Sequence, residues 1–272
     1  MCIRFNQGFL NIDTAWMDRV QEVVNYGIDN DMFVILNIHH EEWYFPTLEN
    51  LKHDTSGIGA VWTQIARRFE GYGEKLIFEG VNEPRLRGCE AEWSGTDEGR
   101  AVVNKYNETF VKAVRAAGEN NAKRILMVTP YAASSEEQNI NALEIPEDSG
   151  KIIVSVHAYL PKEFALEEGT SKYIENNDEV QKFFECVKSA FIDKDIPVII
   201  GEFGAVDKDN INDRIKFVRE YIILGKKYGI PCIWWDNGQK SGSGENFALL
   251  NRYDNTWFFP ELVEALMKTA VD

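Results

Sequence analysis

Two kinds of hydrophobic pattern alternate along the whole chain. In one kind, apolar residues recur every three or four positions, as in Trp16, Val20 and Val24, which is typical of amphipathic helices. In the other, short continuous apolar runs rich in β-branched residues indicate strands covered on both faces. Helices are expected at residues 14–31, 58–72, 97–118, 178–193, 210–229 and 260–270, and a looser, partly helical segment at 134–143. Strands are expected at residues 33–39, 76–82, 124–129, 152–158, 197–203 and 232–236.

Strands that alternate with helices predict a parallel sheet, because parallel neighbours need a crossover connection and the crossover is usually a helix. Polar and aromatic side chains follow nearly every strand, at its carboxyl end. A doubly wound sheet concentrates its ligand at one crevice, whereas a (β/α) barrel gathers such residues from all its strands on one face. The pattern therefore favours α/β architecture of the TIM-type barrel. No linker or shift in composition divides residues 1–272, so we expect a single domain.

Two of the strand ends carry a glutamate. Glu83 stands in Leu76-Ile-Phe-Glu-Gly-Val-Asn-Glu-Pro84, and Glu202 in Pro197-Val-Ile-Ile-Gly-Glu-Phe-Gly204. A carboxylate at the exit of a buried strand is unfavourable unless it faces a cleft or has a partner. A pair of carboxylates is the usual equipment of a glycosidase, one as proton donor and the other as nucleophile or base.

Composition and charge narrow the class of partner. The chain of 272 residues is 44% hydrophobic and carries a net charge of −15, which argues against nucleic acid and anionic membranes but not against a neutral polysaccharide. The four cysteines form no CxxC pattern, so no metal site is expected. No apolar stretch reaches 18 residues, so no membrane span is expected. The N-terminus lacks the apolar core of a signal peptide, which fits a cytoplasmic, a processed or a truncated protein alike.

Five stretches together resemble glycoside hydrolase family 5, of clan A, and its bacterial endoglucanase branch. They are spread over roughly residues 13–270, in the family's order, each at the end of a strand; an isolated Asn-Glu-Pro would be a weak signal. The stretches are Ile35-Leu-Asn-Ile-His-His-Glu41, Ile77-Phe-Glu-Gly-Val-Asn-Glu-Pro84, Val154-Ser-Val-His-Ala-Tyr159, Ile200-Gly-Glu-Phe-Gly-Ala205 and Trp234-Trp-Asp-Asn-Gly238.

The resemblance implies a retaining mechanism, with Glu83 as the general acid/base and Glu202 as the nucleophile. It implies that Asn82 binds the sugar 2-OH and that Tyr159 keeps the Glu202 carboxylate ionised. It further places His157 beside Glu83, His39 beside Glu202 and Trp235 under the reacting sugar. Residues left between a structural role and a sugar contact are His40, Trp43, Tyr44 and Trp93. Asn237 is expected to bind substrate, because Asp236-Asn237 and the loop 241–247 lean toward a glucan. No metal or organic cofactor is implied.

The same resemblance exposes a deficit, because the family's barrel has eight strands and only six are recognisable. Arg4 is the one candidate for the family's second-strand arginine, and its spacing to the first helix is short. An incomplete barrel leaves open strand edges, which invite pairing with another chain. We therefore expect an N-terminally incomplete barrel that forms a homo-oligomer.

The leading hypothesis is an endo-β-1,4-glucanase acting on cellulose, mixed-linkage glucan or xyloglucan. The resemblance implies a secreted, extracellular enzyme, although the chain shows no signal peptide. A mannanase or xylanase of the same family is the rival with the same chemistry. A non-catalytic glycan-binding remnant is the rival of another class, and its signature would be binding without turnover. The preferred glucan stays open at this stage.

Overall fold

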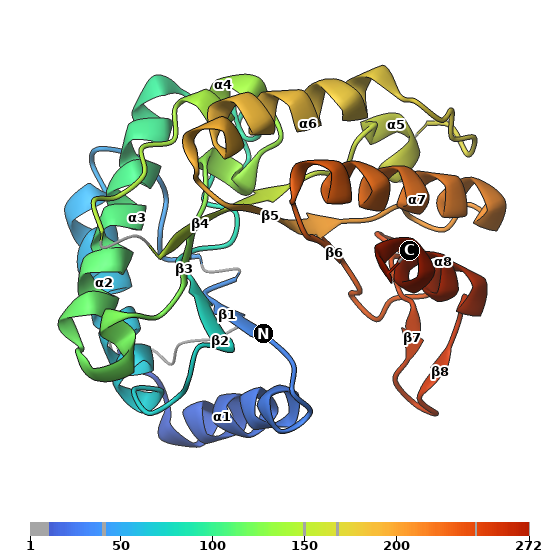
Figure 1. The fold of residues 1–272 in the computed structure, drawn as a ribbon. Helices are drawn as coiled ribbons and strands as arrows, with labels where there is room; N and C mark the ends of the chain where they lie inside the picture. Colours follow the sequence, from blue (N-terminus) through green and yellow to red (C-terminus); the bar gives the residue numbers. More distant parts are fainter. Residues whose placement is uncertain (1–10, 40–41, 149–150, 167–168, 243, 272) are drawn as a thin grey trace. The chain divides into compact units, whose positions relative to one another are not determined.

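The computed structural model describes residues 11–39, 42–148, 151–166, 169–242 and 244–271. The chain forms two compact parts, residues 1–155 and residues 156–272, which are described separately below. The division falls inside the fourth strand, so this strand contributes to both parts (Figure 1). The prediction about Arg4 lies outside the described residues, and so does the one about His40.

The first part is built on parallel strands in sequence order. They are β1 (Val34–Asn37), β2 (Leu76–Glu79), β3 (Leu126–Val128) and the start of β4 (Ile152–His157). Asn37 pairs with Glu79, Glu79 with Met127, and Met127 with Ile153. Because all four strands run the same way, their carboxyl ends share one edge of the sheet.

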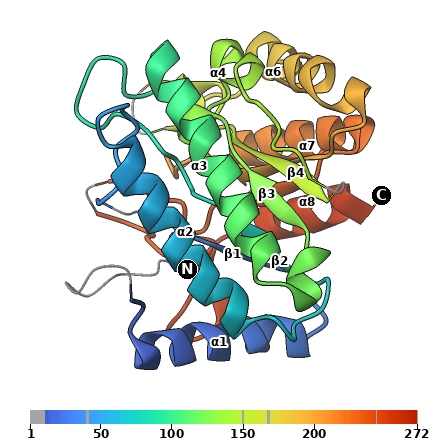
Figure 2. The same ribbon diagram turned by 90° about the vertical axis from the view of Figure 1, so that its left-hand side faces the viewer.

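Helices cover these strands, as the hydrophobic pattern requires. They are α1 (Thr14–Asp29), α2 (Leu51–Arg68), α3 (Asp97–Ala116), η1 (Glu119–Ala122), η2 (Tyr131–Ala133) and α4 (Glu137–Asn141). Figures 1 and 2 show α2 and α3 lying side by side over the sheet. Trp62 of α2 is fully buried against Phe78 of β2 and Phe110 of α3, with ring centroids 5.2 and 4.6 Å away. Its indole N–H donates to the Gly80 carbonyl oxygen over 2.7 Å, so burial leaves no polar group unpaired.

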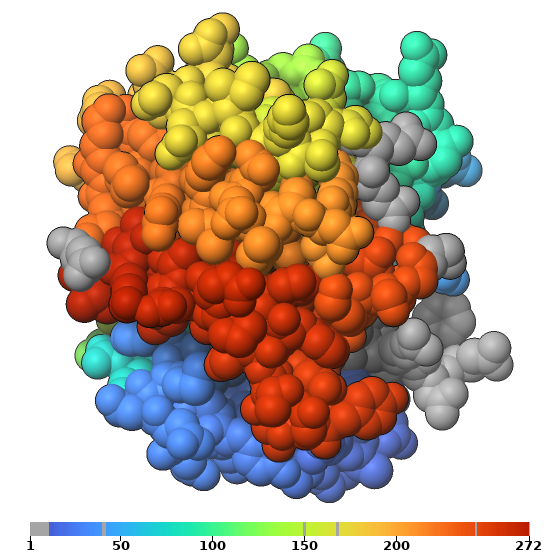
Figure 3. Space-filling view, turned by 90° about the vertical axis from the view of Figure 1, so that its right-hand side faces the viewer, coloured from blue at the N-terminus to red at the C-terminus, as the bar shows by residue number. Residues whose placement is uncertain are grey.

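In the second part, β5 (Val198–Phe203) pairs in parallel with β6 (Cys232–Trp234) and lies beside the end of β4, where Ala158 N–H donates to the Glu202 carbonyl oxygen over 2.9 Å. Phe203 packs against Phe217 and Tyr221 of α7, with ring centroids 6.0 and 5.0 Å away. The helices are α5 (Lys162–Ala165), α6 (Asp178–Ala190), η3 (Ile192–Lys194), α7 (Ile211–Tyr228) and α8 (Pro260–Val271). Figure 3 shows the outer face of this part, where α7 and α8 (orange to dark red) are exposed to solvent.

The order of elements confirms the predicted class, an N-terminally incomplete (β/α) barrel, and in the described part of the chain its sheet has six strands in the order β1 to β6. The main differences from the prediction concern one helix start and some added short elements. Helix α2 begins at Leu51 rather than residue 58, and the chain adds the short helix α5 and an antiparallel hairpin of β7 (Leu250–Asn251) and β8 (Thr256–Trp257). The first turns of α2 read as polar loop, but buried Asp54 accepts from the Phe45 N–H over 2.9 Å and from the Tyr106 hydroxyl, which fixes them as helix.

Among the described residues, no helix combines the length and apolar character that crossing a bilayer requires.

Candidate active site

The first part presents Asn82 and Glu83 just beyond the carboxyl end of β2. The Asn82 N–H donates to the Ile38 carbonyl oxygen over 3.0 Å, so the chain continues β2 alongside β1 past the last residue assigned to the strand. Asn82 is 1% exposed, and the Glu83 side chain keeps 12% exposure. Glu83 is therefore held at a rim where solvent or a substrate can reach it.

Arg85 pairs with Glu83, which sequence reasoning did not anticipate. Its Nη1 donates to Glu83 Oε2 and to the Glu83 carbonyl oxygen, both over 3.1 Å. Its Nε donates to Glu92 Oε1 over 3.0 Å, and its guanidinium lies 4.3 Å from the ring centroid of Trp93. The pKa of the Glu92 carboxyl is held below its usual range, mainly by the hydrogen bond from the Gly88 N–H and to a smaller extent by Arg85. The only available signal was an arginine two positions after the glutamate.

Tyr131 fixes the segment that follows Glu83. The Leu86 N–H donates to the Tyr131 hydroxyl over 2.7 Å, and that hydroxyl reaches the Ala91 carbonyl oxygen at 3.2 Å. Burial raises the pKa of Tyr131, so the phenol stays neutral and able to donate. The Ala132 N–H also donates to the Pro84 carbonyl oxygen over 2.9 Å. These bonds hold the Asn-Glu-Pro turn in one conformation.

His39 and Trp43 follow β1 in the first part. His39 is 7% exposed, and its carbonyl oxygen accepts from the Tyr44 hydroxyl over 3.3 Å. Trp43 packs edge-on against Tyr44, with ring centroids 5.3 Å apart, and over the backbone of Gly57. A Cβ on Gly57 would stand 2.4 Å from that indole, so the glycine makes room for it. Trp43 is half-buried, because part of its ring packs against Tyr44 and Gly57.

A buried cluster that the sequence reading missed lies behind these residues. Asn37 of β1 donates from Nδ2 to Glu79 Oε2 over 2.8 Å and to Asn82 Oδ1 over 3.2 Å. The same nitrogen lies 3.5 Å from His39 Nδ1. The signal was a polar residue inside each of two apolar runs, at positions that the β1–β2 register places opposite each other.

The second part presents Glu202 near the end of β5, 9% exposed. The Tyr159 hydroxyl donates to Glu202 Oε2 over 2.7 Å, and His157 Nδ1 lies 3.5 Å from the same oxygen. His157 and Tyr159 come from the end of β4, the neighbouring strand, so the side chains meet because the two strands run in parallel. A hydrogen bond donated to a carboxylate favours its charged form. His157 thus lies beside Glu202 in this part, and its expected place beside Glu83 stays a prediction.

Trp235 and Asn237 follow β6. The Trp235 N–H donates to the Phe203 carbonyl oxygen over 2.9 Å, which fixes its backbone against β5. The Asn237 side-chain amide donates to the Glu245 carbonyl oxygen over 2.7 Å, and its Oδ1 accepts from the Gln239 N–H. Asn237 therefore shapes the loop behind Trp235. Phe247 of the same loop packs on Tyr159, with centroids 5.4 Å apart.

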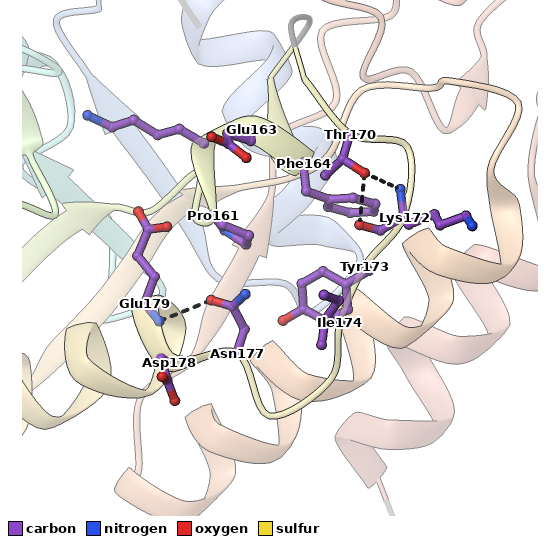
Figure 4. Close-up of a pocket in the computed structure, with 11 residues that line it drawn as sticks. Pro161, Glu163, Phe164, Thr170, Lys172, Tyr173, Ile174, Asn177, Asp178 and Glu179 are labelled. Carbon is purple, nitrogen blue, oxygen red and sulfur yellow. Dashed lines mark hydrogen bonds between the residues drawn. The ribbon is translucent and has the colours of Figure 1, made fainter.

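A pocket of about 580 Å³ opens in the second part, between the start of α5 and the start of α6 (Figure 4). Phe164 and Tyr173 are among the residues that line it, and so is Asn177, whose side chain accepts from the Glu179 N–H over 3.1 Å and caps α6. None of the residues expected at the site lines this pocket. The pocket is lined by the loop after β4 and its neighbours, and neither Glu83 nor Glu202 contributes to its lining.

Comparison with known proteins agrees with these features. Residues 3–241 match the family model of cellulase, glycosyl hydrolase family 5. Endoglucanase B and Endoglucanase 1 of Ruminococcus albus are each 56% identical to the chain and cover 95% and 93% of it. The chain spans only 64% and 62% of the length of these two relatives.

One solved structure resembles this chain in both fold and sequence. It is the GH5-4 broad specificity endoglucanase from Ruminococcus champanellensis with bound cellotriose, at a TM-score of 0.93 and 50% identity over 96% of this chain and 78% of that one. The family model covers most of the chain, and the strand-end glutamates Glu83 and Glu202 lie within the match. The chain therefore belongs to glycosyl hydrolase family 5.

Proposed function

We propose that this chain is the catalytic region of a retaining endo-β-1,4-glucanase, with Glu202 as nucleophile and Glu83 as general acid/base. The observation that carries the proposal is the bond of 2.7 Å from the Tyr159 hydroxyl to Glu202, at a strand end of a family 5 chain. This bond favours a charged carboxylate, as a nucleophile requires. Residues 1–272 would act as one catalytic domain.

The mechanism runs in two displacements. In the first, Glu202 attacks the anomeric carbon and Glu83 protonates the departing glycosidic oxygen, so the bond to the leaving sugar breaks as the glycosyl-enzyme forms. In the second, Glu83 takes a proton from water, which attacks the anomeric carbon and releases Glu202. The mechanism requires the two carboxyl groups to lie about 5–5.5 Å apart.

Arg85 bears on the acid role of Glu83. A guanidinium at 3.1 Å favours the charged form, whereas the first displacement needs a protonated acid. We propose that the incoming sugar displaces the Arg85 bond, leaving Arg85 with Glu92 and Trp93. In the second displacement Glu83 must be charged in order to accept a proton, so the ion pair with Arg85 opposes only the first displacement.

The remaining site residues would bind sugar. Asn82 would hydrogen-bond the 2-OH of the reacting glucose, and Trp235 would stack under its ring. His157 would support Glu202, its neighbour at 3.5 Å. The residues proposed to line the subsites are His39, His40, Trp43 and Asn237. Arg4 is kept as the proposed second-strand arginine.

The substrate proposed is a β-glucan chain, of the cellulose, mixed-linkage or xyloglucan type. Support comes from the names of the two Ruminococcus albus relatives, both endoglucanases, and from the cellotriose bound to the solved relative. A mannanase or xylanase specificity and a catalytically silent glycan binder are the two alternatives. By family resemblance we propose that the natural enzyme acts outside the cell, where such polymers are found.

The test is reducing-end release from mixed-linkage β-glucan, carboxymethyl-cellulose, xyloglucan, mannan and xylan. The parent chain is compared with Glu202→Gln, Glu83→Gln and the exposed control Glu185→Gln on α6. We expect release from glucans by the parent and by the control, and none by either site variant. A folded parent that binds glucan without turnover would show that the chain is a non-catalytic glycan binder. Release from mannan or xylan alone would show that the enzyme is a mannanase or a xylanase.

We also propose that the chain forms a homo-oligomer. Among the described residues, β1 and β6 are the two end strands of the sheet, and each has one edge beside which no described strand lies. Apolar side chains beside these strands are exposed, with Phe33 at 64% and Ile233 at 40%. Multi-angle light scattering at micromolar concentration should give a multiple of 31.1 kDa, and a monomer mass would refute the oligomer.

A further inference from the structure

The buried amide of Asn37 makes the contacts expected of a group that orients another side chain. Asn37, Glu79 and Asn82 are 8%, 5% and 1% exposed, so water competes little for their hydrogen bonds. All three belong to the first part and come from two neighbouring strands, β1 and the end of β2. Only Asn82 has a role in the proposed chemistry.

The bonds of Asn37 fix which way its own amide points. Its Nδ2 carries two hydrogens, and its two shortest contacts are with acceptors, Glu79 Oε2 at 2.8 Å and Asn82 Oδ1 at 3.2 Å, both nearer than His39 Nδ1 at 3.5 Å. A flipped Asn37 amide would turn its oxygen toward the Glu79 oxygen and lose the shorter bond. Glu79 therefore anchors Asn37 in the orientation that donates to Asn82.

The same bond fixes the amide of Asn82. Its two ends, Oδ1 and Nδ2, have nearly the same shape, so packing alone distinguishes them poorly. Because Oδ1 accepts from Asn37, Nδ2 is the end left to donate to a ligand. In the proposed glucanase, the ligand atom that Asn82 meets is the oxygen of the sugar 2-OH, in a contact that strengthens in the transition state.

We propose that Asn37, anchored by Glu79, is a positioning residue that presents the Nδ2 of Asn82 to the 2-OH of the reacting sugar. The inference rests on the proposed function, since it assigns the Asn82 contact to the substrate of that reaction. The inference depends on two hydrogen bonds: Asn37 donates to Glu79, which fixes the Asn37 amide, and Asn37 donates to Asn82, which fixes the Asn82 amide. Loss of Asn37 should weaken catalysis only through the 2-OH.

The experiment compares two aryl β-cellobiosides, one with the 2-OH on the reacting glucose and one with 2-deoxyglucose there. In Asn37→Leu, kcat/KM on the 2-hydroxy substrate should fall about tenfold or more, because the lost contact is one made in the transition state. On the 2-deoxy substrate it should change less than about twofold. Combined with Asn82→Ala, Asn37→Leu should add almost nothing, because the two changes remove the same contact.

Controls separate positioning from folding. Asn121→Leu removes another fully buried amide of the first part, which bonds Ala66 and Arg124, and should affect both substrates alike if folded. Glu79→Gln keeps an oxygen that can accept from Asn37 and should retain most activity. Asn37→Ser, a smaller change, serves if Asn37→Leu does not fold, and should show the same substrate dependence.

Equal loss on both substrates, or full additivity with Asn82→Ala, would overturn the inference and leave Asn37 as a structural residue. Failure of the proposed function has a different signature, namely a folded parent that does not hydrolyse the 2-hydroxy substrate at all. The two failures are thus told apart by the parent enzyme alone.

Discussion

The ion pair between Asp207 and Lys240 should be strongly asymmetric, with one end essential to stability and the other nearly dispensable. Lys240 Nζ donates to Asp207 Oδ2 over 2.6 Å, with side-chain exposures of 38% and 11%. Asp207 Oδ1 also lies 3.6 Å from Nη1 of Arg214, which is 0% exposed and sits over the rings of Trp234 and Phe259. Burial lowers the pKa of Arg214 to about 10, and Asp207 opposes that shift.

The magnitudes follow from burial. Asp207→Asn keeps the shape of the side chain but leaves the buried guanidinium without the carboxylate at 3.6 Å, and removal of one partner of a buried pair costs about 3–5 kcal/mol. Lys240→Met removes a partly exposed charge and leaves Asp207 paired with Arg214, a change of about 0–1 kcal/mol. The melting temperature should fall by about 2–4 °C for each kcal/mol in a chain of this size.

Thermal unfolding followed by circular dichroism gives the comparison. Asp207→Asn should melt about 10 °C below the parent, and Lys240→Met within about 3 °C of it. The control is Asp193→Asn, which breaks the exposed pair of Asp193 with Lys188 and should change little. Equal losses for Asp207→Asn and Lys240→Met would refute the reasoning, because the buried Arg214 would then not depend on the carboxylate.

Two further predictions concern the second part and the thiols. Glu220 is 9% exposed and accepts four hydrogen bonds, three from the segment before α6 and one from Gln181 of α6. Glu220→Gln turns one of these acceptor oxygens into a donor and should lower the unfolding free energy by about 2–4 kcal/mol, whereas exposed Glu185→Gln should not. A melting temperature of Glu220→Gln equal to that of the parent would contradict this. Burial raises the pKa of the Cys232 thiol to about 12, so iodoacetamide at pH 8 should label exposed Cys89 and spare Cys232, as read by peptide mass spectrometry; similar labelling of both would show that Cys232 is not protected.

Periodicity located most elements because local chain geometry and burial act together there. Helix α3 was expected at residues 97–118 and spans Asp97–Ala116, and β5 was expected at 197–203 and spans Val198–Phe203. The start of α2 was missed because its stabilising contacts come from elsewhere in the chain. The bond from Tyr106 to Asp54 crosses 52 positions, and no local pattern reports it.

The candidate site divides in the same way. Glu83, Glu202, Tyr159 and Asn82 stood out in the sequence because each is a polar residue at the end of an apolar run. Arg85 was overlooked because an arginine in a loop usually faces solvent, and its bonds to Glu83 and Glu92 appear only once the turn is folded. The sequence could not assign Asn37 either, since a polar residue within a strand run has no meaning until its partner is known.

By itself, the sequence determined the class of fold and the family, because these depend on residue type and on the order of strands and helices, and it predicted the roles of Glu83 and Glu202. The contact of Tyr159 with Glu202 was expected from the sequence, but only the tertiary structure showed the contacts that Asn37 and His157 make. Parallel pairing of β1 with β2 sets Asn37 against Glu79, and pairing of β4 with β5 sets Tyr159 and His157 against Glu202. Such contacts join positions about forty residues apart, and their free energy comes from excluding water around paired polar groups, which the order of residues alone does not express.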